Sequence, residues 1–451
     1  MYYTPLCMNR ERDNLMCIMK ASLMKTVSPS RYLIVGFLII ILLGSLLLFL
    51  PLTHRPSVSV SYVDALFTSF SAVCVTGLVT LDTATTFNLF GRTVIAILIL
   101  LGGMGFAAVI MSIAILLGWD VGISQRNLIS EAYNLGTLRG TLVIVKTVVF
   151  ASFLFQIIGT VLSFLVFRHD FPPLAAFGHS LFHSISAFNN AGFDLMGEFA
   201  SITNYHNNVL LLGTTMVLII IGGLGFFVLT DVIRNRFRFK KFAMHTKIVM
   251  VMTIFLIIFG TIVVWLAEQV DPLSALFQSV TARTAGFNSI DTGALSFFSL
   301  FFIVLLMFIG ASPGSTGGGI KTTTTFAIWL SLSSLAFGKQ PAAFRRRIPD
   351  DSLLKALQVL ILALLTVTVG TLGLALFEGE KFDFIQIVFE VVSAFATVGL
   401  STGITTEITT MSKLLLMAMM FVGRLGPITV ATSLKRKESR IKFVEERIFI
   451  G

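Results

Sequence analysis

The sequence carries little charge. Lysine, arginine, aspartate and glutamate make up 12% of its 451 residues, whereas hydrophobic residues make up 55%. Soluble domains carry about 25% charged residues because polar groups must cover their surface. The composition therefore excludes an ordinary soluble protein and indicates a membrane protein.

Cysteines and catalytic motifs are also scarce. The spacing of the three cysteines, Cys7, Cys17 and Cys74, fits neither a metal site nor a disulfide framework. The six histidines show no HExxH spacing, and no serine lies in a GxSxG motif. We therefore expect no enzymatic activity. The start of the chain lacks the pattern of a signal peptide, so residues 1–30 are predicted to be a cytoplasmic segment.

Long apolar runs are abundant. A helix needs about 20 residues to cross the hydrocarbon core of a bilayer. Runs of suitable length lie at 32–52, 93–117, 147–167, 209–230, 248–267, 353–377 and 414–432, and an eighth is split by a Gly/Ser/Thr-rich stretch into 298–309 and 323–337. The chain is therefore predicted to be an all-α membrane protein.

Charge follows the connections between these runs. Basic residues cluster after every second run, as in 234–247 and 435–447, whereas the alternate connections are relatively acidic. By the positive-inside rule the basic connections and both termini lie in the cytoplasm, and the alternate connections face outward. The predicted location is the plasma membrane. The net charge of +10 is accounted for by these loops, so it does not indicate nucleic-acid binding.

The predicted outward connections carry four glycine motifs that align with one another. They are SAVCVTG ending at Gly77, SAFNNAG at Gly192, VTARTAG at Gly286 and SAFATVG at Gly399. Before each motif lies a half-apolar segment of about a dozen residues, which is too short to span the bilayer and fits a re-entrant half-helix. A second glycine mark follows on the next helix, beginning at Gly102, Gly222, Gly310 and Gly423. The two sets of glycines together define four repeats, at 31–118, 141–230, 246–337 and 353–432. Each repeat is predicted to contain a helix, a pore half-helix, a glycine loop and a second helix. Residues 433–451 form a predicted cytoplasmic tail.

Backbone chemistry explains the first glycine of each repeat. Polar backbone groups leave a helix at membrane depth only where they line water or pack in protein. Four such loops around one axis can direct carbonyl groups at a dehydrated monovalent cation, and glycine adopts the backbone angles that this requires. For Gly102, Gly105, Gly222 and Gly225 on the following helices, close helix packing is the favoured interpretation.

With four single-glycine pore loops in one chain, residues 30–435 resemble the Trk/Ktr/HKT superfamily of potassium transporters, and most closely the bacterial Ktr membrane subunits. The resemblance implies a potassium-channel-like fold with a pseudo-fourfold pore. It also implies sodium as a modulating ion. Potassium is then coordinated by backbone carbonyls of the filter segments, which comprise Val75, Thr76, Gly77, Asn190, Ala191, Gly192, Thr284, Ala285, Gly286, Thr397, Val398 and Gly399. Gly77 stands where plant relatives that prefer sodium carry serine, so potassium is the expected ion.

The interruption at 310–322 is the second candidate site. Its proline and glycines are incompatible with a regular helix. It is not a phosphate loop, because Ile320 separates the last glycine from Lys321, so no nucleotide is expected on this chain. In the Ktr resemblance this segment is an intramembrane gate, formed here by Gly310, Ser312, Pro313, Gly314, Ser315, Thr316, Gly317, Gly318, Gly319 and Lys321. Lys321 either repels cations in the pore or extends to the membrane interface.

Two arginines lie at predicted membrane depth. Arg424 falls near the middle of run 414–432, where a charge is costly unless it faces protein or water. We expect it to hold the gate loop closed, with a purely structural role between helices as the alternative. Arg283 lies in the third filter motif and is predicted to sit behind the filter, paired with Glu390.

Two other classes of protein remain open at this point. A secondary symporter with discontinuous helices usually has two halves, whereas these four units run in the same direction. A membrane scaffold would tolerate replacement of the motif glycines. By resemblance, the partners are a second copy of the chain in a homodimer and a cytosolic nucleotide-binding RCK ring, and the predicted transport is passive or sodium-modulated potassium uptake.

Overall fold

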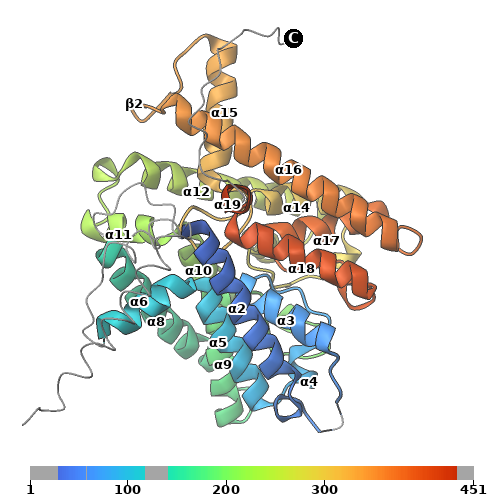
Figure 1. The fold of residues 1–451 in the computed structure, drawn as a ribbon. Helices are drawn as coiled ribbons and strands as arrows, with labels where there is room; N and C mark the ends of the chain where they lie inside the picture. Colours follow the sequence, from blue (N-terminus) through green and yellow to red (C-terminus); the bar gives the residue numbers. More distant parts are fainter. Residues whose placement is uncertain (1–28, 57, 117–140, 434–451) are drawn as a thin grey trace, which may run out of the picture.

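The computed structural model describes residues 29–56, 58–116 and 141–433. The described residues are mostly helical, with very little strand, which confirms the predicted fold class (Figure 1). Nearly all of the predicted cytoplasmic segment 1–30 and tail 433–451 lie outside the described residues, as do Cys7 and Cys17.

Each repeat contributes four helices in the same order: a long first helix, a short pore helix and two halves of a second membrane helix. The first repeat has α2 Pro29–Phe49, α3 Tyr62–Cys74, α5 Leu89–Gly103 and α6 Phe106–Leu116, and the second has α8 Thr141–Phe167, α9 Pro173–Phe188, α10 Val209–Leu224 and α11 Phe226–Arg234. The third has α12 Met244–Glu268, α13 Pro272–Thr281, α14 Phe297–Phe308 and α15 Thr322–Phe337, and the fourth has α16 Asp350–Glu378, α17 Phe384–Ala396, α18 Thr410–Leu425 and α19 Pro427–Ser433. The short helix α4 Thr83–Thr86 and the strands β1 Ala342–Ala343 and β2 Arg346–Arg347 lie in connections.

The long first helices are the clearest membrane spans. Within the described ranges, the helices that are long and apolar enough to cross a bilayer are Ser30–Phe49, Leu142–Phe167, Met244–Glu268 and Asp350–Glu378. Large apolar side chains such as Leu43, Phe150 and Leu376 are exposed on them. A lipid environment accounts for these surfaces, since water would not favour them.

The second membrane helices are bent, which the sequence did not predict. Runs 93–117, 209–230 and 414–432 were expected to be continuous, but α10 and α11 meet at 94°, and α18 and α19 meet at 92°. The breaks occur at Gly105, Gly225 and Gly426, whose φ angles are 75°, 91° and 85°. Positive φ ends the right-handed helix, so the second half of each run leaves in a new direction.

The first and fourth repeats meet and close the arrangement. Figure 1 shows the blue helices α2 and α3 beside the red helices α18 and α19, in agreement with the contacts between α3 and α18. Lys413 of α18 forms a 2.7 Å ion pair with Asp64 of α3, and the Arg31 side chain donates a 2.7 Å hydrogen bond to the Ser433 carbonyl. The repeats therefore form a ring rather than an open row.

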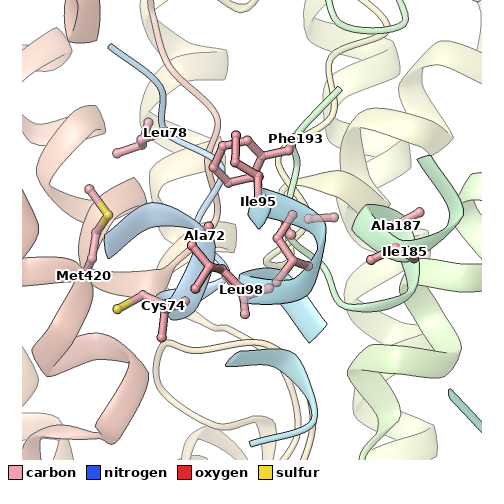
Figure 2. Packing of buried hydrophobic residues seen from close by; sticks show 14 of the residues in the cluster. Ala72, Cys74, Leu78, Ile95, Leu98, Ile185, Ala187, Phe193 and Met420 are labelled. Atoms are coloured by element: carbon pink, nitrogen blue, oxygen red, sulfur yellow. The ribbon is translucent and has the colours of Figure 1, made fainter. Parts of the chain in front are cut away.

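The pore helices are buried at the centre of this ring. In the first three repeats a pore-helix serine donates to a carbonyl of the long helix: Ser69 to Ile41, Ser184 to Gln156 and Ser279 to Ile257. Figure 2 shows the apolar side of the first pore helix, where Ala72 and Cys74 lie near Leu98 and Met420 from neighbouring elements. Serine hydroxyls thus tie the first three pore helices to their own repeats, while apolar packing joins the first pore helix to neighbouring elements.

Candidate ion filter and gate loop

The four predicted filter segments share one unusual backbone pattern. In each, the residue two positions before the glycine and the glycine itself have positive φ: Val75 59° and Gly77 90°, Asn190 58° and Gly192 69°, Thr284 79° and Gly286 79°, Thr397 51° and Gly399 92°. A non-glycine residue in this region is strained by about 1–2 kcal/mol, so its repetition at four equivalent positions indicates a shared purpose.

The filter segments also contact one another in a closed cycle. A Cβ atom added to Gly77 would collide with the Ala191 carbonyl oxygen; the same relation joins Gly192 to Ala285, Gly286 to Val398 and Gly399 to Thr76. Each glycine therefore lies against the carbonyl of the next repeat, and the fourth returns to the first. This geometry brings all twelve sequence-predicted filter residues together around one axis.

Hydrogen bonds fix each loop to the end of its pore helix. In repeats one, two and four, the residue before the glycine donates to a carbonyl five positions earlier: Thr76 to Ser71 and Ala191 to Ser186 at 2.8 Å, and Val398 to Ser393 at 2.9 Å. The third repeat differs, because Ala285 donates to Thr281, four positions earlier, at 3.0 Å. Gly77 and Gly399 also donate to the hydroxyls of Ser71 and Ser393, at 3.0 Å and 3.1 Å.

A cavity of about 340 Å³ opens directly beside the four filter glycines. Asp82, Asp194 and Asp291 line it together with polar loop residues. Burial raises the pKa of Asp194 to about 6; a hydrogen bond from the Met196 amide opposes this shift and the charge of Asp82 adds to it. A negatively lined cavity leading to a ring of carbonyls concentrates cations at that end of the filter.

Close helix packing was predicted for Gly102 and Gly222, and the structure confirms it there and shows it at Gly423 as well. Cβ atoms added to Gly102, Gly222 and Gly423 would collide with the carbonyl oxygens of Val73, Phe188 and Phe395. These three carbonyls occupy the same place in their repeats, four residues before the filter glycine. The second membrane helices thus pack directly against the ends of the pore helices.

The predicted gate loop connects α14 to α15 and is not helical. A parallel bridge pairs Ile309 with Ile320, so the segment returns close to where it began. It is anchored to the bend between α10 and α11: the Ser312 amide donates to Gly223 at 3.1 Å, and the Phe226 amide donates to the Gly314 carbonyl at 2.9 Å. Ser312 and Thr316 are fully buried.

Filter side chains contact this loop. The Thr316 hydroxyl donates to Asn190 Oδ1 at 3.2 Å, and the Gly318 amide donates to Thr397 Oγ1 at 3.0 Å. The sequence indicated only the carbonyl of Asn190. The available signal was a polar side chain at this position in three of the four repeats, where the first repeat has Val75.

The two basic side chains that were predicted to act at the gate, Arg424 and Lys321, both donate hydrogen bonds to carbonyls of the loop. Arg424 donates through Nη1 to the Thr316 carbonyl and through Nη2 to the carbonyls of Gly102 and Gly103 in the first repeat. Lys321 Nζ donates to the loop's own Gly317 carbonyl at 2.6 Å. Arg424 therefore connects the loop to a neighbouring second helix, and Lys321 stabilises the internal turn.

The predicted pairing of Arg283 with Glu390 is wrong. Arg283 lies behind the filter but donates to the Thr253 carbonyl, at 3.4 Å. Glu390 instead accepts hydrogen bonds from Ser401 and Thr405 in the loop after the fourth filter. The two charges belong to adjacent pore segments, but their side chains are directed to different elements.

Comparison with known proteins agrees with this geometry. The family model for TrkH, described as a cation transport protein, matches residues 20–441. The chain belongs to the TrkH family. Its relatives include Ktr system potassium uptake protein B of Bacillus subtilis, 38% identical over 97% of this chain and all of that protein. Potassium/sodium uptake protein NtpJ of Enterococcus hirae is 37% identical, with the same coverage of both chains.

A solved structure supports the fold of this TrkH family member. The crystal structure of the potassium transporter TrkH from Vibrio parahaemolyticus matches with a TM-score of 0.68 and 21% identity, covering 89% of this chain and 84% of that one. The resemblance to the Trk/Ktr/HKT superfamily is thereby confirmed, and so is the architecture of repeated helix, pore segment and helix.

Proposed function

We propose that this chain is the ion-translocating subunit of a potassium uptake system, with a carbonyl-lined filter formed by its four repeats. The observation that carries the proposal is the closed cycle in which Gly77, Gly192, Gly286 and Gly399 each face the carbonyl of the next repeat. A ring of carbonyl dipoles replaces the hydration shell of a monovalent cation. The names of the relatives, which include potassium uptake proteins and a potassium/sodium uptake protein, support potassium as the ion and sodium as a modulator.

The segment 310–322 is the proposed gate. It lies beside the filter side chains on the face opposite the acidic cavity, because it contacts Asn190 and Thr397, whereas the glycines line that cavity. Hydrogen bonds to the bend between α10 and α11 and to Arg424 support its assignment as a loop that closes the pathway. Transport is then passive flow down the electrochemical gradient when the loop moves aside, without catalysis or nucleotide binding by this chain.

The proposed assembly is a plasma-membrane homodimer, with both termini in the cytoplasm, that binds a cytosolic nucleotide-binding RCK ring. The relatives named as parts of a Ktr system support a partner subunit. Exposed basic residues between α11 and α12, including Arg236 and Lys240, offer one docking face. The purified subunit combined with such a ring should show nucleotide-dependent flux, and flux that ignores the nucleotide would remove the ring from the proposal.

Rubidium uptake in a bacterium lacking its own potassium uptake systems tests the core of the proposal. We expect Gly77→Ser to reduce the preference for rubidium over sodium, because the new side chain would collide with the Ala191 carbonyl. Gly213→Ser is the matched control, since a Cβ atom there has no neighbour within 4 Å among the residues that the structure describes. A deletion inside 314–319 should raise uptake. Uptake that is unchanged by both Gly77→Ser and the deletion would refute the filter and the gate together.

A further inference from the structure

The position two residues before each filter glycine does more than shape the backbone. Val75, Asn190, Thr284 and Thr397 occupy it, and all four have positive φ. All are fully buried. In three repeats the side chain is polar, and a buried polar side chain is retained at a net gain only when its hydrogen bonds are made.

These three polar side chains contact three consecutive residues of the gate loop. Asn190 Oδ1 accepts from the Thr316 hydroxyl, and Thr397 Oγ1 accepts from the Gly318 amide. Gly317 lies against Thr284, because a Cβ atom added to it would collide with Thr284 Oγ1. Asn190 Nδ2 donates to Thr284 Oγ1 at 3.2 Å and so joins the second repeat to the third.

The first repeat supplies no such side chain, since Val75 cannot form a hydrogen bond through its side chain. Arg424 contacts the loop on this side: it binds the Thr316 carbonyl and the first-repeat carbonyls of Gly102 and Gly103. Thr316 is consequently held at two points, its hydroxyl by the filter and its carbonyl by Arg424. The loop is fixed to the filter as well as to the surrounding helices.

We propose that Asn190, Thr284 and Thr397 act as a latch that holds the gate loop against the filter, and that a cation at this end of the filter and the closed loop disfavour each other. This inference rests on the proposed function. In the closed loop the Gly318 N–H group points its positive end at the Thr397 hydroxyl, and the hydroxyl of Thr284 already accepts from Asn190. A cation coordinated by these oxygens would compete with the donors for the same lone pairs. By linkage, occupancy by the ion favours release of the loop to the same extent that closure weakens binding of the ion.

Rubidium uptake by the full-length chain without its regulator tests the latch. Thr316→Val removes the hydroxyl but not the backbone carbonyl bound by Arg424, and uptake should rise by about five- to tenfold, as expected for one lost buried hydrogen bond. Thr316→Ser retains the hydroxyl and should behave as wild type. Thr366→Val in α16 is the matched control, because its partly buried hydroxyl donates to the Leu362 carbonyl of the same helix rather than to the filter or the loop. Equal uptake by Thr316→Val and Thr366→Val, or lower uptake by Thr316→Val, would overturn the latch.

The same uptake measurements distinguish a wrong latch from a wrong proposed function. If wild type does not take up rubidium in preference to sodium, the proposed function fails. If it does and Thr316→Val matches Thr366→Val, only the latch fails. Thr397→Val changes both the filter and the latch. To separate the two effects, uptake is measured for this variant with the loop intact and with a deletion inside 314–319, and the first value is divided by the second. The latch predicts that this ratio exceeds the wild-type ratio, and an unchanged or lower ratio contradicts it.

Antagonism between ion and loop needs a readout other than flux. In a chain whose cysteines are replaced by serine, Ser315→Cys places a thiol on the partly buried loop. The thiol should react faster with a water-soluble reagent in potassium than in choline, and Thr397→Val should abolish this difference. Equal rates in the two salts, or a slower rate in potassium, would refute the antagonism.

Discussion

Replacement of Gly399 by alanine separates the two reasons for which a filter glycine is required. Gly399 has φ of 92°, and a Cβ atom there would approach the Thr76 carbonyl oxygen far inside 3.0 Å, a limit that real Cβ atoms essentially never cross. Gly403, four residues later, has φ of 97°, but a Cβ atom there meets no atom of the described part of the chain within 4 Å. Alanine at positive φ is destabilised by about 1–2 kcal/mol, and both variants share this penalty. Only Gly399→Ala also pushes a carbonyl of the first repeat out of the ring, by roughly an ångström in a densely packed interior.

Rubidium and sodium uptake, normalised to the amount of protein in the membrane, distinguish the two effects. Displacement of one coordinating carbonyl should reduce rubidium uptake by Gly399→Ala by about tenfold or more, which corresponds to about 1.4 kcal/mol, and should weaken discrimination against sodium. Gly403→Ala should remain within about twofold of wild type, since the shared backbone penalty affects stability rather than the ring. Equal losses of uptake in the two variants would show that backbone strain alone explains the glycine and would refute the closed ring of carbonyls.

Three further changes test other parts of the structure. Arg424→Met removes charged hydrogen bonds to the loop and the first repeat, so unregulated rubidium uptake should rise by about tenfold or more. Burial raises the pKa of Asp194 to about 6, so acidification from about pH 7.5 to about 5 should neutralise it and raise the KM for rubidium about twofold. Asp194→Asn should remove this pH dependence of KM. A KM that still depends on pH in this variant would exclude Asp194 as its cause. Lys413→Met breaks the shielded pair with Asp64 and should destabilise the detergent-solubilised protein by about 1–2 kcal/mol, whereas Lys381→Met breaks an exposed pair and should cost less than about 0.5 kcal/mol in the same thermal unfolding assay.

The sequence predicted the parts of this protein that recur four times. A filter glycine in one repeat is weak evidence, but Gly77, Gly192, Gly286 and Gly399 stand in the same register within similar motifs, and the structure brings them together. The short apolar segments before them were predicted to be pore half-helices on length alone, and they are α3, α9, α13 and α17. Repetition thus compensates for the weakness of each single motif.

Features that depend on direction in space were not predictable in this way. The glycine pairs Gly102 and Gly105, or Gly222 and Gly225, were interpreted as packing sites. The first glycine of each pair is one. Gly105 and Gly225 bend the helix instead of only packing, although Gly225 also lies against the Pro313 carbonyl. Sequence spacing does not distinguish a glycine that needs a close neighbour from one that needs a positive φ. The pairing of Arg283 with Glu390 failed for a similar reason, because the sequence brings two segments together without indicating where each side chain points.

In the third repeat, the proposed gate loop takes the place of a helix contact that supports the filter in the other three repeats. In the other repeats a glycine of the second helix packs against the carbonyl four residues before the filter glycine, and this rigid contact supports the filter from behind. Gly310 stands at the equivalent place in the third repeat but packs against the Gly318 carbonyl of its own loop. The support that a helix gives elsewhere is here supplied by a non-helical segment, which also binds Asn190 and Thr397. In the proposed mechanism, movement of this segment would remove a support of the filter and open the path beside it in one step. The proposal therefore places ion binding and gating together in the repeat that departs from the fourfold pattern.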